Sequence, residues 1–383
     1  MTIGILKEIE GENRVAMLRK CVAVVVKMNV TVLVEAGAGQ AAFASDEEYE
    51  QSGAKITTKA EVIAGADLLI KIQPPTPEEI ALMKEGQVIM AVLNPYFNAN
   101  LIKELAAKNI TSFSMDVVPR TSRAQTMDIL SSMATVAGYK AVLTAANTLP
   151  KFFPMFMTAA GTIKPADMLI LGAGVAGLQA IAISRKLGAV VYVFDVRADV
   201  KEQVIGIGGK FIEVEGATDD KTAGGYAVEQ TDEFKARQAQ AIHDQAVKSD
   251  VVICTAQIPG RRAPLLLKKE TVESMKAGSV IIDLAASTGG NCELTKDNET
   301  VVYKGVKIIG NSQFPSDMPH DASRMYGKNM INFLKLIITK EGNLNLNWDD
   351  DIVKGTAVTH GKEIVHERVK ATNSYCELQE VLV

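Results

Sequence analysis

Residues 168–195 read MLILGAGVAGLQAIAISRKLGAVVYVFD and decide the fold class. An apolar run at Met168–Leu171, which predicts a buried strand, leads directly into Gly172-Ala-Gly174-Val-Ala-Gly177. Helical apolar spacing follows, and a second apolar run ends in Asp195. Strand, glycine turn, helix, strand and acid, in this order, are the pattern of a dinucleotide-binding fold.

The glycines of this turn have distinct expected roles. Gly172 allows a tight turn, Gly174 lets the backbone approach a pyrophosphate, and Gly177 lets the helix pack closely on the strand. The first N–H groups of the helix would face the phosphates. A glycine turn that binds no ligand is the alternative, but both strands, the helix and the acid together favour binding.

Asp195 predicts which dinucleotide binds. Its carboxylate would accept hydrogen bonds from the adenosine-ribose hydroxyls, and its charge would oppose a 2′-phosphate. NAD(H) is therefore favoured over NADP(H), although Arg197, two residues on, leaves some room for the second.

The chain has 383 residues, more than one core usually holds, so two domains are expected. A net charge of −4 argues against a nucleic-acid binder. The four cysteines lie far apart without a CxxC pair, so neither a disulfide framework nor a metal site is predicted. No apolar run reaches about 18 residues and the N-terminus lacks signal-peptide order, so no transmembrane segment is expected.

Short apolar runs alternate with helical stretches along most of the chain, which is typical of parallel sheets covered by helices. One long helix is predicted from Ser122 to about Leu149, with Ser122 and Gln125 at capping-box spacing, and a second over about 322–340. We therefore expect an α/β fold: two Rossmann-like domains with mostly parallel sheets, joined by two long helices, with a cofactor cleft between them. The expected domains are residues 1–135 with 322–383, and residues 136–321.

Residues 119–132, PRTSRAQTMDILSS, form the densest polar cluster. On a helix, Gln125, Asp128 and Ser131 would share one face. Two arginines at its N-terminal end, Arg120 among them, would oppose the helix dipole, which favours acids there. A solvated face is the plain interpretation, but arginines so placed favour contact with a carboxylate or a ligand.

Three loops are harder to interpret. Glycine-bearing loops at 255–264 and 283–291 follow strands, at the edge where ligands of open α/β sheets lie, but ordinary loop chemistry explains either equally well. Gly225-Tyr226 lies in a polar insertion whose composition favours a solvated surface loop over a lid.

Hydroxy-acid and amino-acid dehydrogenases need an acid/base group, most often a histidine, beside the carbon that loses hydride. The four histidines, His243, His320, His360 and His366, lie neither at a strand end of the first domain nor in a cofactor loop.

With these motifs in place, the chain resembles the NAD(H)-binding component (domain I, or the soluble part of the alpha subunit) of the proton-translocating nicotinamide nucleotide transhydrogenases. The resemblance covers nearly the whole length. It rests on these segments: Lys7-Glu8 with Glu12–Ala16, 119–132 with Ala137–Tyr139, Gly172–Gly177, Val200–Gln203, Ala223–Ala227, Ile258–Gly260 and Gly289–Cys292.

Alanine dehydrogenase is the nearest relative of that family and differs at two positions. It has a histidine where Asn94-Pro95 stands here, and an aspartate where Ser287 stands. Arg14 and Lys71, which resemble its substrate-binding pair, remain. Without the histidine and the aspartate, amino-acid oxidation loses its proton handling.

The resemblance implies direct hydride transfer from NADH bound here to NADP+ on a partner component. Transfer between two nicotinamide rings moves no proton at the reacting carbons, so no general acid is needed. The residues that match the family's catalytic set around the nicotinamide are Arg120, Gln125, Asp128 and Ser131. Tyr226 matches a residue on a mobile loop that closes over the nucleotide, which reverses the interpretation from composition. The nucleotide-binding set is Gly172, Gly174, Val175, Ala176, Gly177, Asp195, Val196, Arg197, Gly225, Tyr226, Ala256 and Gln257.

The resemblance further implies a homodimer, an NADP(H)-binding component and a membrane component that translocates protons, with no metal and no nucleic acid. The chain would lie on the cytoplasmic or matrix-like face, held at the membrane by its partners. An alanine dehydrogenase-like enzyme and a catalytically silent NAD-binding module remain as alternatives.

Overall fold

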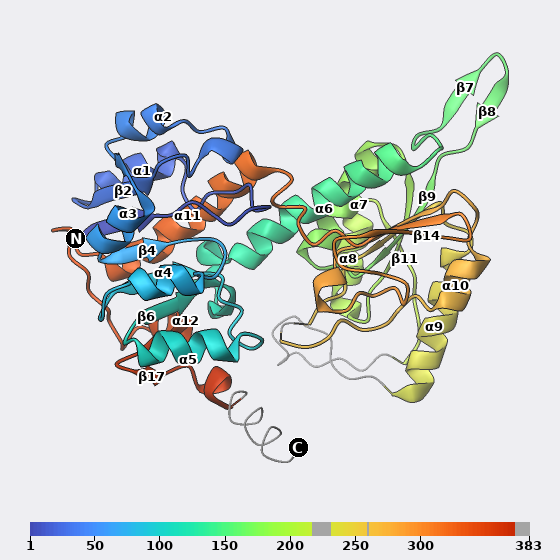
Figure 1. Cartoon of the computed structure of the whole chain (residues 1–383). Coiled ribbons are helices and arrows are strands. Elements are labelled where there is room, and N and C mark those ends of the chain that lie inside the picture. The colour runs from blue at the N-terminus through green and yellow to red at the C-terminus, as the bar shows by residue number, and fades with distance from the viewer. Residues whose placement is uncertain (217–230, 259, 372–383) are drawn as a thin grey trace. The chain divides into compact units, whose positions relative to one another are not determined.

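The computed structural model describes residues 1–216, 231–258 and 260–371. The chain divides into two compact units (Figure 1): unit 1 contains Met1–Met133 and the residues from Ser316 onward, and unit 2 contains Ala134–Pro315. The sequence places the two divisions after residues 135 and 321, and those boundaries stay a prediction.

Unit 1 is built on an eight-stranded sheet in the order β17-β16-β6-β5-β4-β1-β2-β3. All pairs are parallel except β17 with β16 and β16 with β6. The strands are β1 (Thr2–Ile5), β2 (Thr31–Glu35), β3 (Lys55–Thr57), β4 (Leu68–Ile70), β5 (Val88–Ala91), β6 (Thr111–Ser114), β16 (Ala357–His360) and β17 (Glu363–Ile364).

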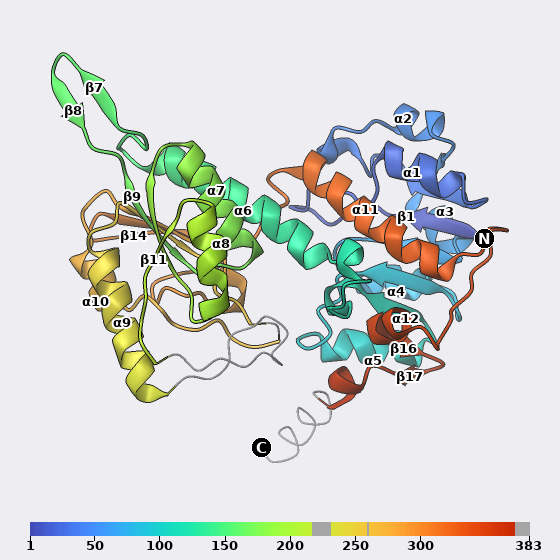
Figure 2. The same ribbon diagram turned by 180° about the vertical axis from the view of Figure 1, so that it is seen from behind.

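The sheet of unit 1 is buried on both faces because its strands alternate between two apolar cores. Leu68 and Ile70 of β4 face one core, which also contains Phe333, whereas Leu69 faces a second core with Leu105. The covering helices are α1 (Arg19–Val26), α2 (Asp46–Gln51), α3 (Lys59–Gly65), α4 (Pro77–Leu82), α5 (Ala99–Ala107), α11 (Pro319–Ile337) and α12 (Asp351–Thr356). Figure 2 shows α11 beside α1.

Unit 2 contains a seven-stranded sheet in the order β11-β10-β9-β12-β13-β15-β14, parallel except for β14 against β15. Met168 and Ile170 face one core, Leu169 and Leu171 the other. The strands are β9 (Asp167–Leu171), β10 (Val190–Phe194), β11 (Lys210–Phe211), β12 (Val251–Cys254), β13 (Val280–Asp283), β14 (Thr300–Tyr303) and β15 (Val306–Ile309). The helices are α7 (Val175–Lys186), α8 (Lys201–Gly206), α9 (Asp232–Ala246) and α10 (Lys269–Ser274). The predicted α/β fold with two mostly parallel sheets is confirmed.

A two-stranded hairpin, β7 (Phe156–Thr158) with β8 (Gly161–Ile163), projects from unit 2 (Figure 1). All six strand residues are exposed, including Met157 at 77%. The sequence analysis predicts no strand in this region because short exposed strands leave no buried face to produce a pattern.

Helix α6 (Ile129–Thr148) crosses the division between the units, whereas α11 lies wholly in unit 1 and the return crossing precedes it. The prediction of a helix from Ser122 is wrong in its first turns, because Gln125–Met127 form a 3₁₀ turn and the α-helix starts at Ile129. Among the described helices, α6 alone is long and apolar enough to span a membrane by length and composition, a feature that the sequence prediction missed. Ala141, Val142 and Ala145 of α6 belong to a core of unit 2.

Candidate functional site: the glycine turn of unit 2 and the polar segment of unit 1

The three glycines between β9 and α7 have different surroundings. Gly172 has φ +101°, and a Cβ there would lie 2.6 Å from Oγ1 of Thr255. A Cβ on Gly177 would lie 2.0 Å from the carbonyl oxygen of Gly172. Gly174 has no neighbour within 4 Å of the corresponding position. Packing therefore requires the first and third glycines, while the second leaves backbone open to a phosphate group.

The N-terminus of α7 is capped differently from those of the short helices in unit 1. Ser45, Thr58 and Thr76 form complete capping boxes at α2, α3 and α4. At α7 the N-cap residue is Gly174, no side chain caps the helix, and the first turn contains no acid. The N–H groups and the positive dipole end are thus left for an anion, and the turn fits the pyrophosphate of a dinucleotide.

Asp195, directly after β10, contacts this turn. Its Oδ2 accepts a hydrogen bond from the N–H of Ala173 at 2.7 Å and from the Arg197 guanidinium at 2.8 Å. Its Oδ1 accepts from the Arg197 backbone N–H at 2.9 Å and from Nε at 3.0 Å. The structure therefore brings the predicted acid and the glycine turn together, and Arg197 shields the carboxylate.

Ala256 and Gln257 follow β12 at the same sheet edge as the glycine turn. The sheet order turns at this point, since β10 lies on one side of β9 and β12 on the other. Ligands of open α/β sheets bind at such a switch point. Asn291 accepts a hydrogen bond from the Ala256 N–H at 3.0 Å, and Gln257 Nε2 donates to the Leu284 carbonyl at 3.0 Å. The sequence left this loop open and did not single out Asn291, whose only signal was its place after a strand that ends in a carboxylate.

The polar segment of unit 1 is not the single helical face that the sequence predicts. Ala124 and Met127 are buried, and they anchor the 3₁₀ turn so that Arg120 and Gln125 are exposed. Asp128 precedes α6 and caps it, accepting hydrogen bonds from the Ser131 N–H at 2.9 Å and from its hydroxyl at 2.6 Å. The cap is therefore Asp128 with Ser131 and not Ser122 with Gln125.

Side chains distant in sequence fix the same segment. Arg123 binds Asp350 through two hydrogen bonds of 2.7 and 2.8 Å and also pairs with Asp351. Arg123 therefore does not act on a helix dipole, and it holds the pKa of Asp350 at about 2. Asn329 and Asn332 of α11 donate to the carbonyl of Thr126 at 2.8 and 3.1 Å.

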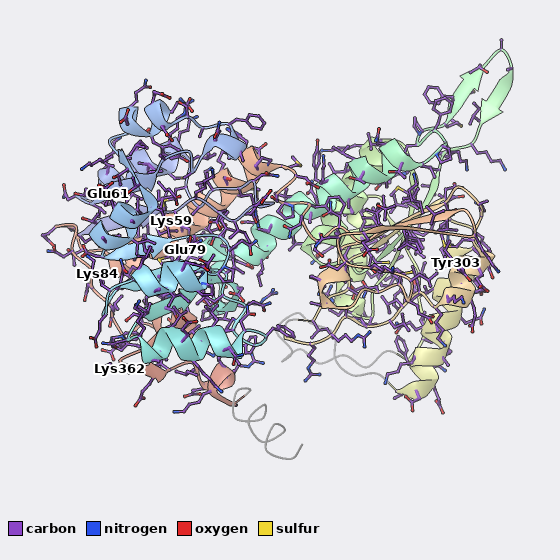
Figure 3. All side chains as sticks on the ribbon, in the orientation of Figure 1. Lys59, Glu61, Glu79, Lys84, Tyr303 and Lys362 are labelled. Carbon is purple, nitrogen blue, oxygen red and sulfur yellow. The ribbon has the colours of Figure 1, made fainter. Side chains whose placement is uncertain are left out.

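A buried charged cluster lies elsewhere in unit 1, around Lys71. Lys71 is fully buried and donates to Glu79 at 2.6 Å, and Lys59 approaches Glu79 at 3.3 Å (Figure 3). Arg14 forms a two-pronged contact with Glu12 at 2.6 and 2.7 Å. Both cations that resemble a substrate-binding pair are thus neutralised by carboxylates of the chain itself.

Glu8 lies in the same cluster and accepts hydrogen bonds from the N–H groups of Ile72 and Gln73 at 2.6 and 3.1 Å. Burial raises the pKa of this carboxyl to about 7, against the opposing charge of Lys71.

The four histidines have structural surroundings. His243 and His360 each contact a threonine hydroxyl at 3.0 Å, and His360 also stacks on Trp348. His320 is exposed beside Asp321, and His366 packs edge-on against Tyr96. Gly225 and Tyr226 lie outside the described residues, within which no group of three or more potential metal ligands occurs.

Family models match both units. The alanine dehydrogenase/PNT N-terminal domain matches residues 4–137, and the alanine dehydrogenase/PNT C-terminal domain matches residues 141–367. The chain belongs to the alanine dehydrogenase/PNT family.

Within the alanine dehydrogenase/PNT family, the chain groups with transhydrogenase alpha subunits, as its motifs predict. It is 46% identical over 376 residues to an NAD(P) transhydrogenase subunit alpha chain of Rhodospirillum rubrum, covering 96% of this chain and 98% of that one. A crystal structure of transhydrogenase from Sinorhizobium meliloti has a TM-score of 0.88 and 41% identity, covering 95% and 100%. An L-alanine dehydrogenase structure, with a TM-score of 0.83, 24% identity and coverage of 98% and 99%, shares the fold.

Proposed function

We propose that this chain is the NAD(H)-binding component of a proton-translocating transhydrogenase. The observation that carries the proposal is the turn at Gly172–Gly177, where Gly174 leaves the backbone open and α7 has no side-chain cap. The chain's grouping with NAD(P) transhydrogenase alpha subunits supports the reaction.

Each proposed role follows from the chemistry of the residue. Gly174, Val175, Ala176 and Gly177 bind the pyrophosphate through backbone N–H groups. Asp195 binds the adenosine ribose, with Val196 and Arg197 beside it, and Ala256 and Gln257 contact the nucleotide from the next strand. Gly225 and Tyr226 close over it.

We propose that Arg120, Gln125, Asp128 and Ser131 orient the nicotinamide end and exclude water from it. When both nucleotides are bound, hydride passes from NADH here to NADP+ on the partner component, and no proton is exchanged at either carbon. The histidines, engaged as described above, are not needed for this step. An amino-acid dehydrogenase would need such a group, and Glu12 and Glu79 occupy its two cations.

The proposed assembly is a homodimer with an NADP(H)-binding component and a membrane component that translocates protons. The chain would lie at the cytoplasmic or matrix-like face, bound through these partners, and without a metal. The apolar side chains exposed on the hairpin, Phe156, Met157 and Ile163, support a role for unit 2 in contacts between chains.

The test mixes the purified chain with the NADP(H)-binding component of a relative and follows NADH-dependent reduction of an NADP+ analogue. Transfer that needs both components supports the proposal. Oxidation of alanine, or reduction of pyruvate, with NAD(H) and the chain alone would overturn it in favour of a dehydrogenase. Binding of NADH with neither activity would indicate a silent module.

Asp195→Asn tests the proposed cofactor selection. The variant keeps an acceptor for Ala173 but loses the charge, so we expect NADH affinity to fall about tenfold or more. Asp199→Asn, an exposed acid four residues on, is the matched control and should leave affinity unchanged. Calorimetric titration measures both, and equal affinities in the two variants would remove Asp195 from the ribose site.

A further inference from the structure

Asn291 uses its whole amide group to hold one loop. The side chain is fully buried, its Oδ1 accepts a hydrogen bond from the Ala256 N–H at 3.0 Å, and its Nδ2 donates to the carbonyls of Ala256 and Pro264 at 2.9 and 2.8 Å. These are backbone groups that follow β12 and belong to no strand ladder. One side chain therefore fixes both ends of the peptide backbone at Ala256.

Asn291 is itself held from behind by Asp283, at the end of β13. Oδ2 of Asp283 accepts hydrogen bonds from the N–H groups of Asn291 and Cys292 at 2.8 and 3.0 Å, and from the Thr295 hydroxyl at 2.7 Å. Its Oδ1 accepts from the Ala285 N–H at 3.0 Å. A buried carboxylate without a cation is costly, and these donors compensate for it.

Thr255 extends the same network to the glycine turn. Its hydroxyl lies 3.1 Å from the carbonyl oxygen of Gly172 and 3.2 Å from that of Leu171. The contacts from Asp283 through Asn291 and Thr255 to Gly172 thus cross three neighbouring strands, β13, β12 and β9, along one sheet edge.

We propose that Asn291 is a positioning residue for the nicotinamide half of the nucleotide. This inference rests on the proposed function. A dinucleotide spans the switch point of the sheet, and Asp195 places the adenosine half on the β10 side of β9. The β12 side then receives the other half, and Asn291 holds Ala256 and Gln257 there.

The experiment compares NADH with ADP, which lacks the nicotinamide half, by calorimetric titration of the full chain. Asn291→Ala frees the backbone at Ala256, so we expect the Kd for NADH to rise about tenfold while that for ADP stays within about twofold. Ser279→Ala is the matched control: Ser279 is buried in the same sheet, but its hydroxyl bonds at the opposite edge, to Ser249. It should change neither Kd.

Thr255→Val and Thr255→Ser keep the inference testable if Asn291→Ala folds poorly. Valine has the shape of threonine without the hydroxyl, so it should weaken NADH more than ADP, whereas serine should bind both normally. Equal losses for NADH and ADP in Asn291→Ala and Thr255→Val would overturn the inference, as would no loss. If the selective loss is seen but no transhydrogenation occurs, the inference stands and the proposed reaction fails.

Discussion

Gly174 and Gly177 are three residues apart, yet a methyl group has different consequences at each. At Gly177 the Cβ would collide with the backbone at Gly172, so Gly177→Ala should lower the free energy of unfolding by about 1–3 kcal/mol. At Gly174 the space is open, so Gly174→Ala should keep its stability and lose NADH affinity. Thermal melts with NADH titrations measure both effects. A Gly174→Ala protein that melts as early as Gly177→Ala would contradict the distinction.

Glu8 predicts a pH dependence of stability. Its pKa is about 7 in the folded chain and near 4.5 ordinarily, so the folded state binds the proton more tightly. Stability from this group is fully present below about pH 4.5 and is lost as the pH rises through 7, by at most about 3 kcal/mol. Glu8→Gln should therefore flatten the decline in melting temperature between pH 5 and 8.

The control for Glu8→Gln is Glu10→Gln, at an exposed position of the same loop. It should retain the decline of the parent protein. An unchanged slope in Glu8→Gln would show that the carboxyl titrates in its ordinary range.

Among the helices, α6 and α7 approach each other through a glycine. A Cβ on Gly138 would lie 2.2 Å from the carbonyl oxygen of Ala176, in the first turn of α7. Gly138→Ala should therefore destabilise the protein, although alanine is favoured over glycine in a helix by about 1 kcal/mol. Displacement of α7 should also weaken NADH binding.

Gly206→Ala serves as the helix control, because no atom lies within 4 Å of its Cβ position at the end of α8. Urea denaturation compares the two variants. If Gly138→Ala were as stable as the parent, the two helices would have to separate without cost.

The segment 119–131 shows where prediction from sequence stops. Residue spacing identified its polar side chains, and their proposed role came from the family resemblance. Spacing did not predict that the α-helix starts at Ile129, because Asp350, Asn329 and Asn332 hold the preceding turn from more than two hundred residues away. Helix signals are local, whereas these partners meet only in the folded chain.

At the scale of the whole molecule, alternating apolar runs predicted both parallel sheets because strands buried on two faces need continuous apolar sequence. The antiparallel members were weaker: β14 and β7 expose alternate or all residues and gave no pattern. The glycine turn was readable in full, since each of its constraints lies within 30 residues. The network around Asn291 was not, because it depends on the pairing of β12 with β13.

The two units have separate cores, so a ligand of one should not stabilise the other. Trp348, the single tryptophan, packs on a core of unit 1, whereas the proposed ADP-binding turn lies in unit 2. At 100 times its Kd, ADP should add about 2.7 kcal/mol to the unfolding of unit 2. In urea, the circular dichroism transition should then shift while the Trp348 fluorescence midpoint stays. Equal shifts in both signals would mean that the units unfold together.

The contact between Arg197 and Asp195 turns nucleotide binding into an exchange reaction. With four donors already on its oxygens, the carboxylate can accept ribose hydroxyls only as the guanidinium withdraws. The gain on binding is therefore a difference between two sets of hydrogen bonds, which keeps the affinity moderate. A component that must load NADH and release NAD+ in every cycle benefits from such an internal competitor, because it limits how long the product is retained.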